Sequence, residues 1–195
     1  MRVPCSPVQD IVTIQPATLV ESRRGMEAVL KDVSNPQHRA WLEMFKNHWW
    51  SESTGDLATT RTTLAESVVF RRYGTPIVAV GLVLDTRDQV MARYQSALDS
   101  GLRPGGPLEE ARWSFGSWGI AVEGIFTLFS WGRNLARYDP SLEPDAAYMS
   151  RFRMSALLPF EANTGLLAGE ILYAGEVLAL EPSSLEQRER VYRVD

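Results

Sequence analysis

The stretch AAYMSRFRMSALLPFEANTGLLAGEILYAGEVLAL, residues 146–180, decides the fold. Polar and apolar residues alternate through Tyr148–Phe160, and this alternation is the period of a β-strand with one buried face. Turn residues follow up to Gly165, and Leu166–Leu180 predicts a second strand. A long hairpin of this kind needs a layer that covers its apolar face, so the rest of the chain has to supply that layer.

The first half of the chain supplies helices. Thr18-Leu-Val-Glu21 has the form of a capping box and opens a predicted helix that stops before Pro36. A second helix is predicted from Asn35 to Gly55, with Pro36 in its first turn. The apolar residues of this helix, its two histidines and Glu52 fall on one helical face: His38, Trp41, Leu42, Phe45, His48, Trp49 and Glu52.

The remaining elements follow from turn and cap residues. Asp56 caps a short predicted helix, and Asp85-Thr-Arg-Asp88 opens another that Gly101 closes. The remaining predicted segments are strands at 67–73, 111–115 and 120–130, a loop at 102–108, and a polar connection at 131–143. The sequence leaves open whether this connection forms a lid.

Helices followed by a mostly antiparallel sheet predict an α+β fold. We expect a cone-shaped, strongly curved sheet wrapped around a long N-terminal helix, with a cavity at the open end. The expected organisation is an N-terminal arm and helix at 1–35, an α+β domain at 36–182 and a charged tail at 183–195. The tail would be a solvated helix or a disordered end.

Composition excludes several classes of protein. The 195 residues carry a formal net charge of −4, so the chain has no basic surface for nucleic acid. No apolar run approaches the roughly 18 residues of a membrane span. The one cysteine, Cys5, and the two histidines make a structural metal site improbable and fit a cytoplasmic location. Gly105-Gly106 lies between prolines without a following lysine, so it is not a phosphate-binding loop, and we expect no cofactor.

A family resemblance rests on five segments in a fixed order. They are the helix Trp41–Trp50, the junction Ser53-Thr-Gly-Asp-Leu57, the strand Val68–Gly74, the helix Asp85–Gly101 with its Gln89–Tyr94 core, and the hairpin strand Thr164–Tyr173. This order, over roughly residues 36–180, resembles the nuclear transport factor 2-like superfamily and in particular its SnoaL-like branch. Catalytic members often carry His or Asp on the first strand. At that place this chain has Phe70-Arg-Arg-Tyr73 instead.

The resemblance implies a cone-shaped, cystatin-like fold that is often dimeric, with a small-molecule pocket between helices and sheet. The superfamily includes polyketide cyclases, ketosteroid isomerase, scytalone dehydratase and limonene epoxide hydrolase, and also non-catalytic binding modules. The fold alone therefore does not give the function.

Strand alternation sorts the remaining charges. Glu123, Arg151, Arg153 and Glu170 are expected on one face. They would form either a catalytic carboxylate pair held by arginines or, as we favour, a cross-strand ladder of ion pairs on the outer face. The opposite face would line the pocket, with Tyr148, Ser150 and Tyr173 as its few polar groups, unless these residues only pack the core.

Two residues are candidates for catalysis. His48 lies on the tryptophan-rich helical stripe and could act as general acid or base, although a core histidine bonded to backbone is the more common situation. Tyr73 could stabilise an oxyanion, although such tyrosines often anchor a helix to a sheet. The expected substrate-binding residues are Trp41, Phe45, Trp49, Tyr94, Trp113, Tyr148, Ser150, Phe152 and Tyr173.

Two functions remain open. The first is a cofactor-independent isomerase, cyclase, dehydratase or hydrolase that acts on an apolar small molecule. The second is a non-catalytic ligand-binding or dimerisation module of the same fold. The expected partners are an apolar small molecule and a second copy of the chain, with neither nucleic acid nor a membrane.

Overall fold

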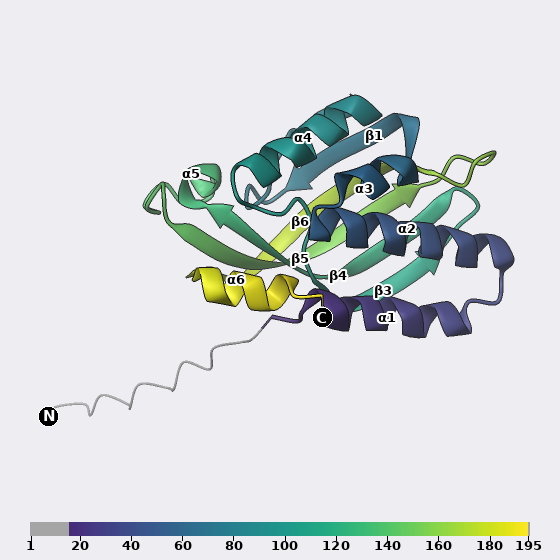
Figure 1. Ribbon diagram of the computed structural model, residues 1–195, viewed down its shortest axis with the longest axis horizontal. Coiled ribbons are helices and arrows are strands. Elements are labelled where there is room, and N and C mark those ends of the chain that lie inside the picture. Colours follow the sequence, from purple (N-terminus) through teal and green to yellow (C-terminus); the bar gives the residue numbers. More distant parts are fainter. Residues whose placement is uncertain (1–15, 195) are drawn as a thin grey trace, which may run out of the picture.

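The protein is a curved six-stranded sheet with helices packed on it, seen in a computed structural model that describes residues 16–194 (Figure 1). The strand order is β2-β1-β6-β5-β4-β3. The helices are α1 (Leu19–Asp32), α2 (Pro36–Thr54), α3 (Leu57–Thr63), α4 (Arg87–Asp99), α5 (Gly132–Leu135) and α6 (Leu185–Tyr192). The strands are β1 (Leu64–Gly74), β2 (Val83–Thr86), β3 (Leu108–Phe115), β4 (Gly119–Trp131), β5 (Ala147–Pro159) and β6 (Leu167–Pro182).

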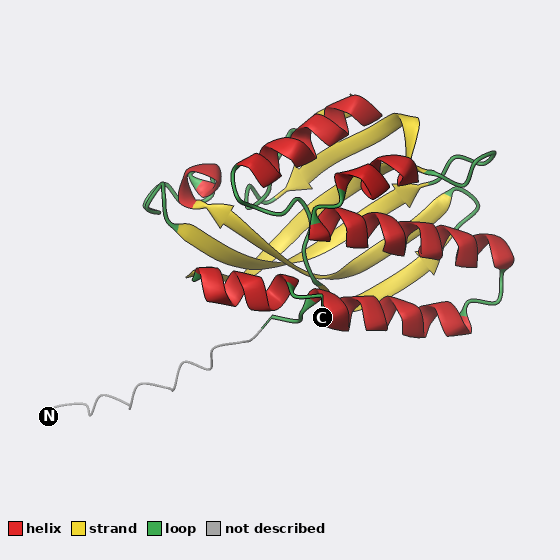
Figure 2. Cartoon of the chain, viewed as in Figure 1, coloured by secondary structure: helices red, strands yellow, loops and turns green. Residues whose placement is uncertain are grey.

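The predicted hairpin forms the centre of the sheet. β5 and β6 pair antiparallel, as do β4 with β5, β3 with β4 and β1 with β2, whereas β1 runs parallel to β6 (Figure 2). The α+β class and the mostly antiparallel curved sheet are confirmed. The edge strand β2 was not predicted, because it has only four residues and none of them is fully buried.

Helix caps confirm most of the predicted boundaries. At α1 the Thr18 backbone N–H donates to Glu21 Oε2 at 2.7 Å, and the Glu21 N–H donates to Thr18 Oγ1 at 3.2 Å, which completes the capping box. Asn35 caps α2, and Gly55 ends it in a left-handed conformation with a φ of 83°. The cap of α4 is Thr86, which lies within the predicted cap signal Asp85-Thr-Arg-Asp88.

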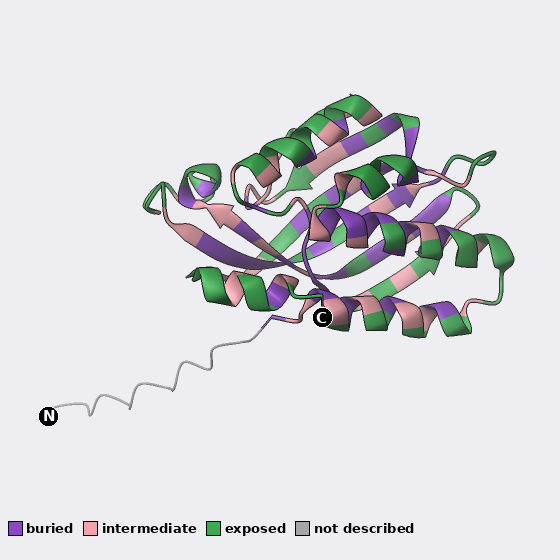
Figure 3. Ribbon diagram, viewed as in Figure 1, coloured by how far each residue is buried: buried purple, intermediate pink, exposed green. Residues whose placement is uncertain are grey.

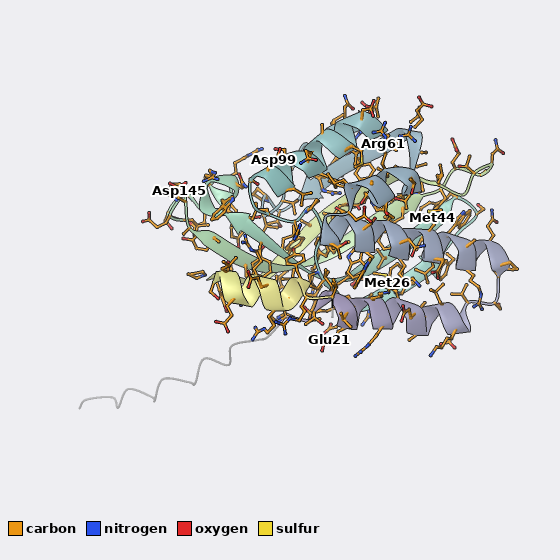
Figure 4. All side chains as sticks on the ribbon, viewed as in Figure 1. Glu21, Met26, Met44, Arg61, Asp99 and Asp145 are labelled. Atoms are coloured by element: carbon orange, nitrogen blue, oxygen red, sulfur yellow. The ribbon has the colours of Figure 1, made fainter. Side chains whose placement is uncertain are left out.

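The core lies between α2 and the sheet. The buried stripe of α2 includes Trp41, Leu42, Phe45 and Trp49, and Figure 3 shows this helix with its buried positions toward the strands. α1 adds buried side chains to the same core, among them Met26, which lies on the side of α1 nearest α2 (Figure 4). None of the helices within residues 16–194 is long and apolar enough to cross a membrane.

The segments after β4 and β6 pack against the rest of the molecule. The 131–143 connection contains α5, whose Leu135 is buried, and its Glu143 N–H donates to the Tyr148 hydroxyl at 3.1 Å. The C-terminal segment forms the helix α6, with Val191 buried, rather than a disordered end. The Tyr192 hydroxyl donates to the Gly105 carbonyl at 2.7 Å and ties α6 to the loop before β3.

A close backbone approach at Gly106 generates a stability prediction. A Cβ at Gly106 would lie 2.0 Å from the Thr127 carbonyl oxygen, whereas a Cβ at Gly25 in α1 would meet no atom within 4 Å. We expect Gly106→Ala to lower the free energy of unfolding by about 1–3 kcal/mol through overpacking. Gly25→Ala should raise it by about 0.5–1 kcal/mol through helix propensity. Urea denaturation measures both, and equal effects of the two changes would contradict the packing argument.

Candidate functional site

A cavity of about 350 Å³ lies between α2, α4 and the sheet. This volume is within the range of small-molecule sites, and most of the wall is apolar. The apolar wall comes from the helices, from strands β1, β2, β4, β5 and β6, and from the loop after β1. Its members include Phe45, Trp49, Phe70, Ile77, Leu84, Val122, Phe126, Met154, Leu158 and Leu172. The cavity therefore has the character expected for an apolar ligand.

Four polar side chains from four different elements form a cluster in this wall: Glu52 from α2, Arg72 from β1, Tyr94 from α4 and Glu170 from β6. The lining also includes the polar residues Arg93, Arg103, Ser130 and Asn134. Arg72 and Glu170 form an ion pair. The parallel register explains it, because Phe70 lies beside Glu170 and Arg72 lies beside Leu172. Side chains two residues apart on neighbouring strands share a face, so Arg72 and Glu170 both point into the cavity.

Glu52 is the group with the most unusual environment. It ends the buried stripe of α2, and only 5% of its surface is exposed. Burial raises the pKa of its carboxyl to about 8, the charge of Glu170 acts in the same direction, and Arg72 and the Tyr94 phenol act in the opposite direction. Glu52 is therefore mostly a neutral carboxylic acid at pH 7, in a water-poor cavity beside an ion pair.

Tyr94 and Arg72 complete the electrostatics of this cluster. Burial raises the pKa of the Tyr94 phenol well above its ordinary value, so the hydroxyl keeps its proton. Among residues 16–194 the Tyr94 hydroxyl has no hydrogen-bond partner of good geometry. Burial alone would lower the pKa of Arg72, but Glu170, Tyr94 and Glu52 together raise it, so the guanidinium is always charged. This cluster thus contains a hydroxyl donor, Tyr94, which already acts on the Glu52 carboxyl, and a fixed cation, Arg72, which is paired with Glu170.

His48 is fully buried beside this cluster and does not line the cavity. Its Nδ1 lies 2.7 Å from Thr63 Oγ1 of α3, and its Nε2 lies 3.6 Å from Glu52 Oε2. Burial lowers the pKa of the imidazole to about 3, so the ring is neutral at physiological pH. From this position His48 does not reach a ligand in the cavity directly.

Tyr73 and Tyr173 lie on the opposite, outer face of the sheet. They are partners in the β1–β6 register, their rings stack with centroids 5.2 Å apart, and they are 44% and 47% exposed. The face predicted for Tyr173 and Glu170 is thus reversed. The burial pattern of β6 changes phase near Gly169, next to a register irregularity in β1, and an alternation read from one end of the strand misses that change.

The other charges of the expected ladder form separate ion pairs. Arg151 is buried and binds Glu109 of β3, with Nη2 and Oε2 at 2.9 Å. Arg153 approaches Glu176 at 3.7 Å on the exposed side. The favoured interpretation, ion pairs rather than a catalytic set, fits these arginines but not Glu170, which belongs to the cavity.

The expected substrate-binding residues divide into two groups. Phe45, Trp49 and Tyr94 line the cavity, and the Trp49 Nε1–H donates to the Gly106 carbonyl at 2.8 Å, which fixes its ring. The other expected residues lie outside the lining. Three of them pack against aromatic rings: Trp41 on Phe160, Trp113 on Phe45 and Phe152 on Phe126. The Ser150 hydroxyl donates to the Leu128 carbonyl, and the Tyr148 hydroxyl accepts from the Glu143 N–H.

Sequence reasoning did not select Glu52, Arg72 or Glu170 as the site. Glu52 carried a usable signal, since an acid on an otherwise aromatic stripe must be buried or paired. Glu170 was considered as part of a catalytic carboxylate pair, but with other partners and as the less favoured alternative. Arg72 carried no signal, because only the parallel register brings β1 next to β6. Within residues 16–194 no three His, Cys, Asp or Glu side chains are grouped so as to hold a metal ion.

Comparisons of the structure give the same fold in several bacterial proteins. A candidate SnoaL-like polyketide cyclase from Jannaschia sp. CCS1 matches with a TM-score of 0.54 and 12% identity, over 73% of this chain and 90% of that one. A candidate polyketide cyclase from Xanthomonas campestris pv. campestris matches with a TM-score of 0.52 and 14% identity, over 70% and 91%. One from Shewanella putrefaciens CN-32 matches with a TM-score of 0.50 and 11% identity, over 76% and 86%.

The chain has the SnoaL-like form of the nuclear transport factor 2-like fold. No protein-family model and no curated protein matches the sequence. At these identities the likeness extends to the fold alone, and the function of the cavity has to be argued from its own side chains.

The raised pKa of Glu52 generates a prediction about stability. The unfolded carboxyl loses its proton near 4.5 and the folded one near 8, so between these values the folded state binds one more proton. The free energy of unfolding should then fall with rising pH, by at most about 1.4 kcal/mol for each pH unit, and the fall should level off as the pH passes 8. Measurements between about pH 7 and 8 reduce the opposite contribution of His48, which comes from protonation of the unfolded imidazole around its ordinary pKa of 6.5.

Glu52→Gln should remove most of that slope in urea denaturation, because the amide does not titrate. Glu123→Gln, an exposed carboxylate on β4, is the matched control and should keep it. Identical slopes in the wild-type protein and the Glu52→Gln variant would show that Glu52 titrates normally.

Proposed function

We propose that this protein is a cofactor-independent acid/base enzyme that acts on an apolar small molecule. The observation that carries the proposal is Glu52, a buried carboxyl with a pKa of about 8 in the wall of an apolar cavity. A general acid or base works best with a pKa near the working pH, and enzymes raise carboxyl pKa values by burial for this purpose.

The roles of the other cavity groups follow from their chemistry. Glu52 would donate a proton to, or remove one from, a bound substrate, and it can do both in turn because its pKa is close to neutral. The protonated Tyr94 hydroxyl would donate a hydrogen bond to an oxygen on which negative charge develops. Arg72 adds a fixed positive charge, and Glu170 balances it in the resting state.

The substrate would be held mainly by the apolar wall. Phe45 and Trp49 present aromatic surface to the cavity, and Phe126, Leu158 and Leu172 face it from the sheet. Apolar residues outnumber polar ones in the lining, so a molecule with a few oxygen functions on an apolar skeleton fits it. Isomerase, cyclase, dehydratase and hydrolase reactions can all begin with such a proton transfer.

The alternative is a non-catalytic binding module of the same fold. The observation in its favour is that the wall of the cavity is mostly apolar, which is sufficient to bind an apolar ligand without any reaction. In that case Glu52, Tyr94 and the ion pair would fix the orientation of the ligand. The two functions differ in what happens when Glu52 can no longer exchange a proton.

A proton-transfer assay separates them. The wild-type protein is incubated in D₂O with a panel of apolar ketones and enones, and deuterium incorporation next to the carbonyl is followed by NMR. We expect at least one compound to exchange, and Glu52→Gln to slow its exchange by about 10²–10⁴-fold. Glu123→Gln should exchange at the wild-type rate, since that side chain is exposed.

Binding of the same compounds is measured by calorimetry in the wild-type protein and in the Glu52→Gln variant. Because glutamine has the shape of glutamic acid, affinity should change little in this variant. Tight binding with no exchange by the wild-type protein across the panel would favour the binding module, and full exchange by Glu52→Gln would exclude Glu52 as the acid/base group.

We further propose that two copies of the chain associate through the outer face of the sheet. Four exposed apolar side chains share this face: Val69, Tyr73, Val83 and Tyr173. Contiguous exposed apolar surface on a sheet is costly in water and is commonly covered by a partner. A two-fold pair would bury the same patch of each copy.

Light scattering after gel filtration tests this association. Tyr73→Lys replaces one ring of the stacked tyrosine pair on this face with a charge and should shift the protein from dimer to monomer. Tyr138→Lys is the matched control, because Tyr138 is 37% exposed in the segment after α5 and away from the sheet face. A wild-type protein that is monomeric at every concentration would contradict the proposal.

A further inference from the structure

A chain of hydrogen bonds with a fixed direction runs from α3 to His48. The Thr63 hydroxyl oxygen lies 2.6 Å from the Thr60 carbonyl oxygen and 2.7 Å from His48 Nδ1. Two oxygens at 2.6 Å require a hydrogen between them, and a carbonyl has none to give. The single hydrogen of the Thr63 hydroxyl is therefore used on Thr60, and Thr63 can only accept from His48.

This direction fixes the tautomer of the imidazole. Because the ring is neutral, one nitrogen carries a hydrogen and the other carries a lone pair. Nδ1 must be the donor to Thr63, so Nε2 is left as an acceptor. Two threonines of α3 thus decide which nitrogen of a histidine on α2 is protonated.

The Nε2 acceptor has no hydrogen-bond partner among residues 16–194, and His48 is fully buried. Leaving such a group unsatisfied costs about 1–3 kcal/mol. Glu52 Oε2 lies 3.6 Å away, one helical turn further along α2, which is several tenths of an ångström beyond a hydrogen bond. A carboxylate has no hydrogen to donate there, whereas a neutral carboxylic acid has one.

We propose that His48 is a positioning residue that holds the proton of Glu52 on Oε2, through a hydrogen bond from the carboxylic acid to Nε2. A small rotation of the Glu52 side chain closes the distance, and this bond satisfies the open acceptor of the imidazole. The proton is then kept on the oxygen nearest His48, and Oε1 is left as the oxygen without it. This inference assigns a role within the proposed function and rests on Glu52 as its acid/base group.

The sign of the effect on Glu52 follows from the tautomer. A hydrogen bond to the neutral acid favours the protonated form, so the Nδ1–H tautomer raises the pKa of Glu52. The opposite tautomer would donate from Nε2 to a carboxylate and lower it. The other charged and titratable groups that act on Glu52 from the packed elements are Arg72 on β1, Glu170 on β6, Tyr94 on α4 and Tyr192 on α6.

Thr63→Val and Thr63→Ser form a matched pair that tests this role. Valine has the shape of threonine but accepts no hydrogen bond, so His48 should change to the Nε2–H tautomer to avoid an unsatisfied donor. Serine keeps the hydroxyl. In a carbon-13 NMR titration of the free protein, we expect the Glu52 pKa to fall by about one unit or more in the Thr63→Val variant and to stay within a few tenths in the Thr63→Ser variant.

Nitrogen-15 NMR of the His48 ring in the wild-type protein gives a second measurement that does not depend on any variant folding. A protonated Nδ1 and an unprotonated Nε2 are expected. A wild-type ring protonated on Nε2, or an equal Glu52 pKa in the Thr63→Val and Thr63→Ser variants, would overturn the proposal. Neither readout uses turnover, so failure here leaves the role of Glu52 intact, and full turnover by Glu52→Gln leaves the tautomer result intact.

Discussion

The parallel pairing of β1 with β6 is the constraint on which the rest of this structure depends. It joins the helical first half of the chain to the C-terminal hairpin, and the other strand pairs of the sheet are antiparallel. Its register decides which side chains enter the cavity, because Arg72 and Glu170 share one face while Tyr73 and Tyr173 share the other. A shift of β1 by one residue against β6 would turn Arg72 away from the cavity and Tyr73 toward it, and Glu170 would lose its partner.

Burial and the ion pair between Arg72 and Glu170 together determine the pKa of the Glu52 carboxyl. A carboxyl in an apolar wall prefers to be neutral, and the negative charge of Glu170 adds to the preference. Glu170 differs from Glu52 because the Arg72 guanidinium binds its carboxylate directly, and the positive charge favours the ionised form. Two acids in one cavity thus have different environments, one paired and one unpaired, which is the arrangement by which two carboxyls take separate roles.

Much of the fold could be predicted from the sequence, because local signals are strong there. The capping residues Thr18 and Asn35, the terminal Gly55 and the 146–180 hairpin all act within a few residues of their own position, and the structure confirms them. The SnoaL-like fold was also recognisable from the order of these elements. β2 and the helical fold of the C-terminal segment depend on tertiary packing and were harder to predict.

The site was less predictable for a physical reason. The sorting of side chains by alternation assumes an unbroken strand, and β6 changes phase near Gly169, so Tyr173 and Glu170 were assigned to the wrong faces. His48 was selected as a candidate general acid or base, but a helical stripe cannot distinguish a residue that faces a cavity from one buried beside it.

The buried histidine and the cavity carboxyl are better understood as one unit than as two candidates. They are four residues apart on α2, so the helix itself holds them on one face at a fixed separation. The helix cannot fix the proton, because both residues can donate or accept. The direction comes from α3, where Thr63 has its hydrogen committed to the Thr60 carbonyl. The junction between α2 and α3, opened by Gly55 and capped by Asp56, is thus what turns a pair of ambiguous groups into a polarised one.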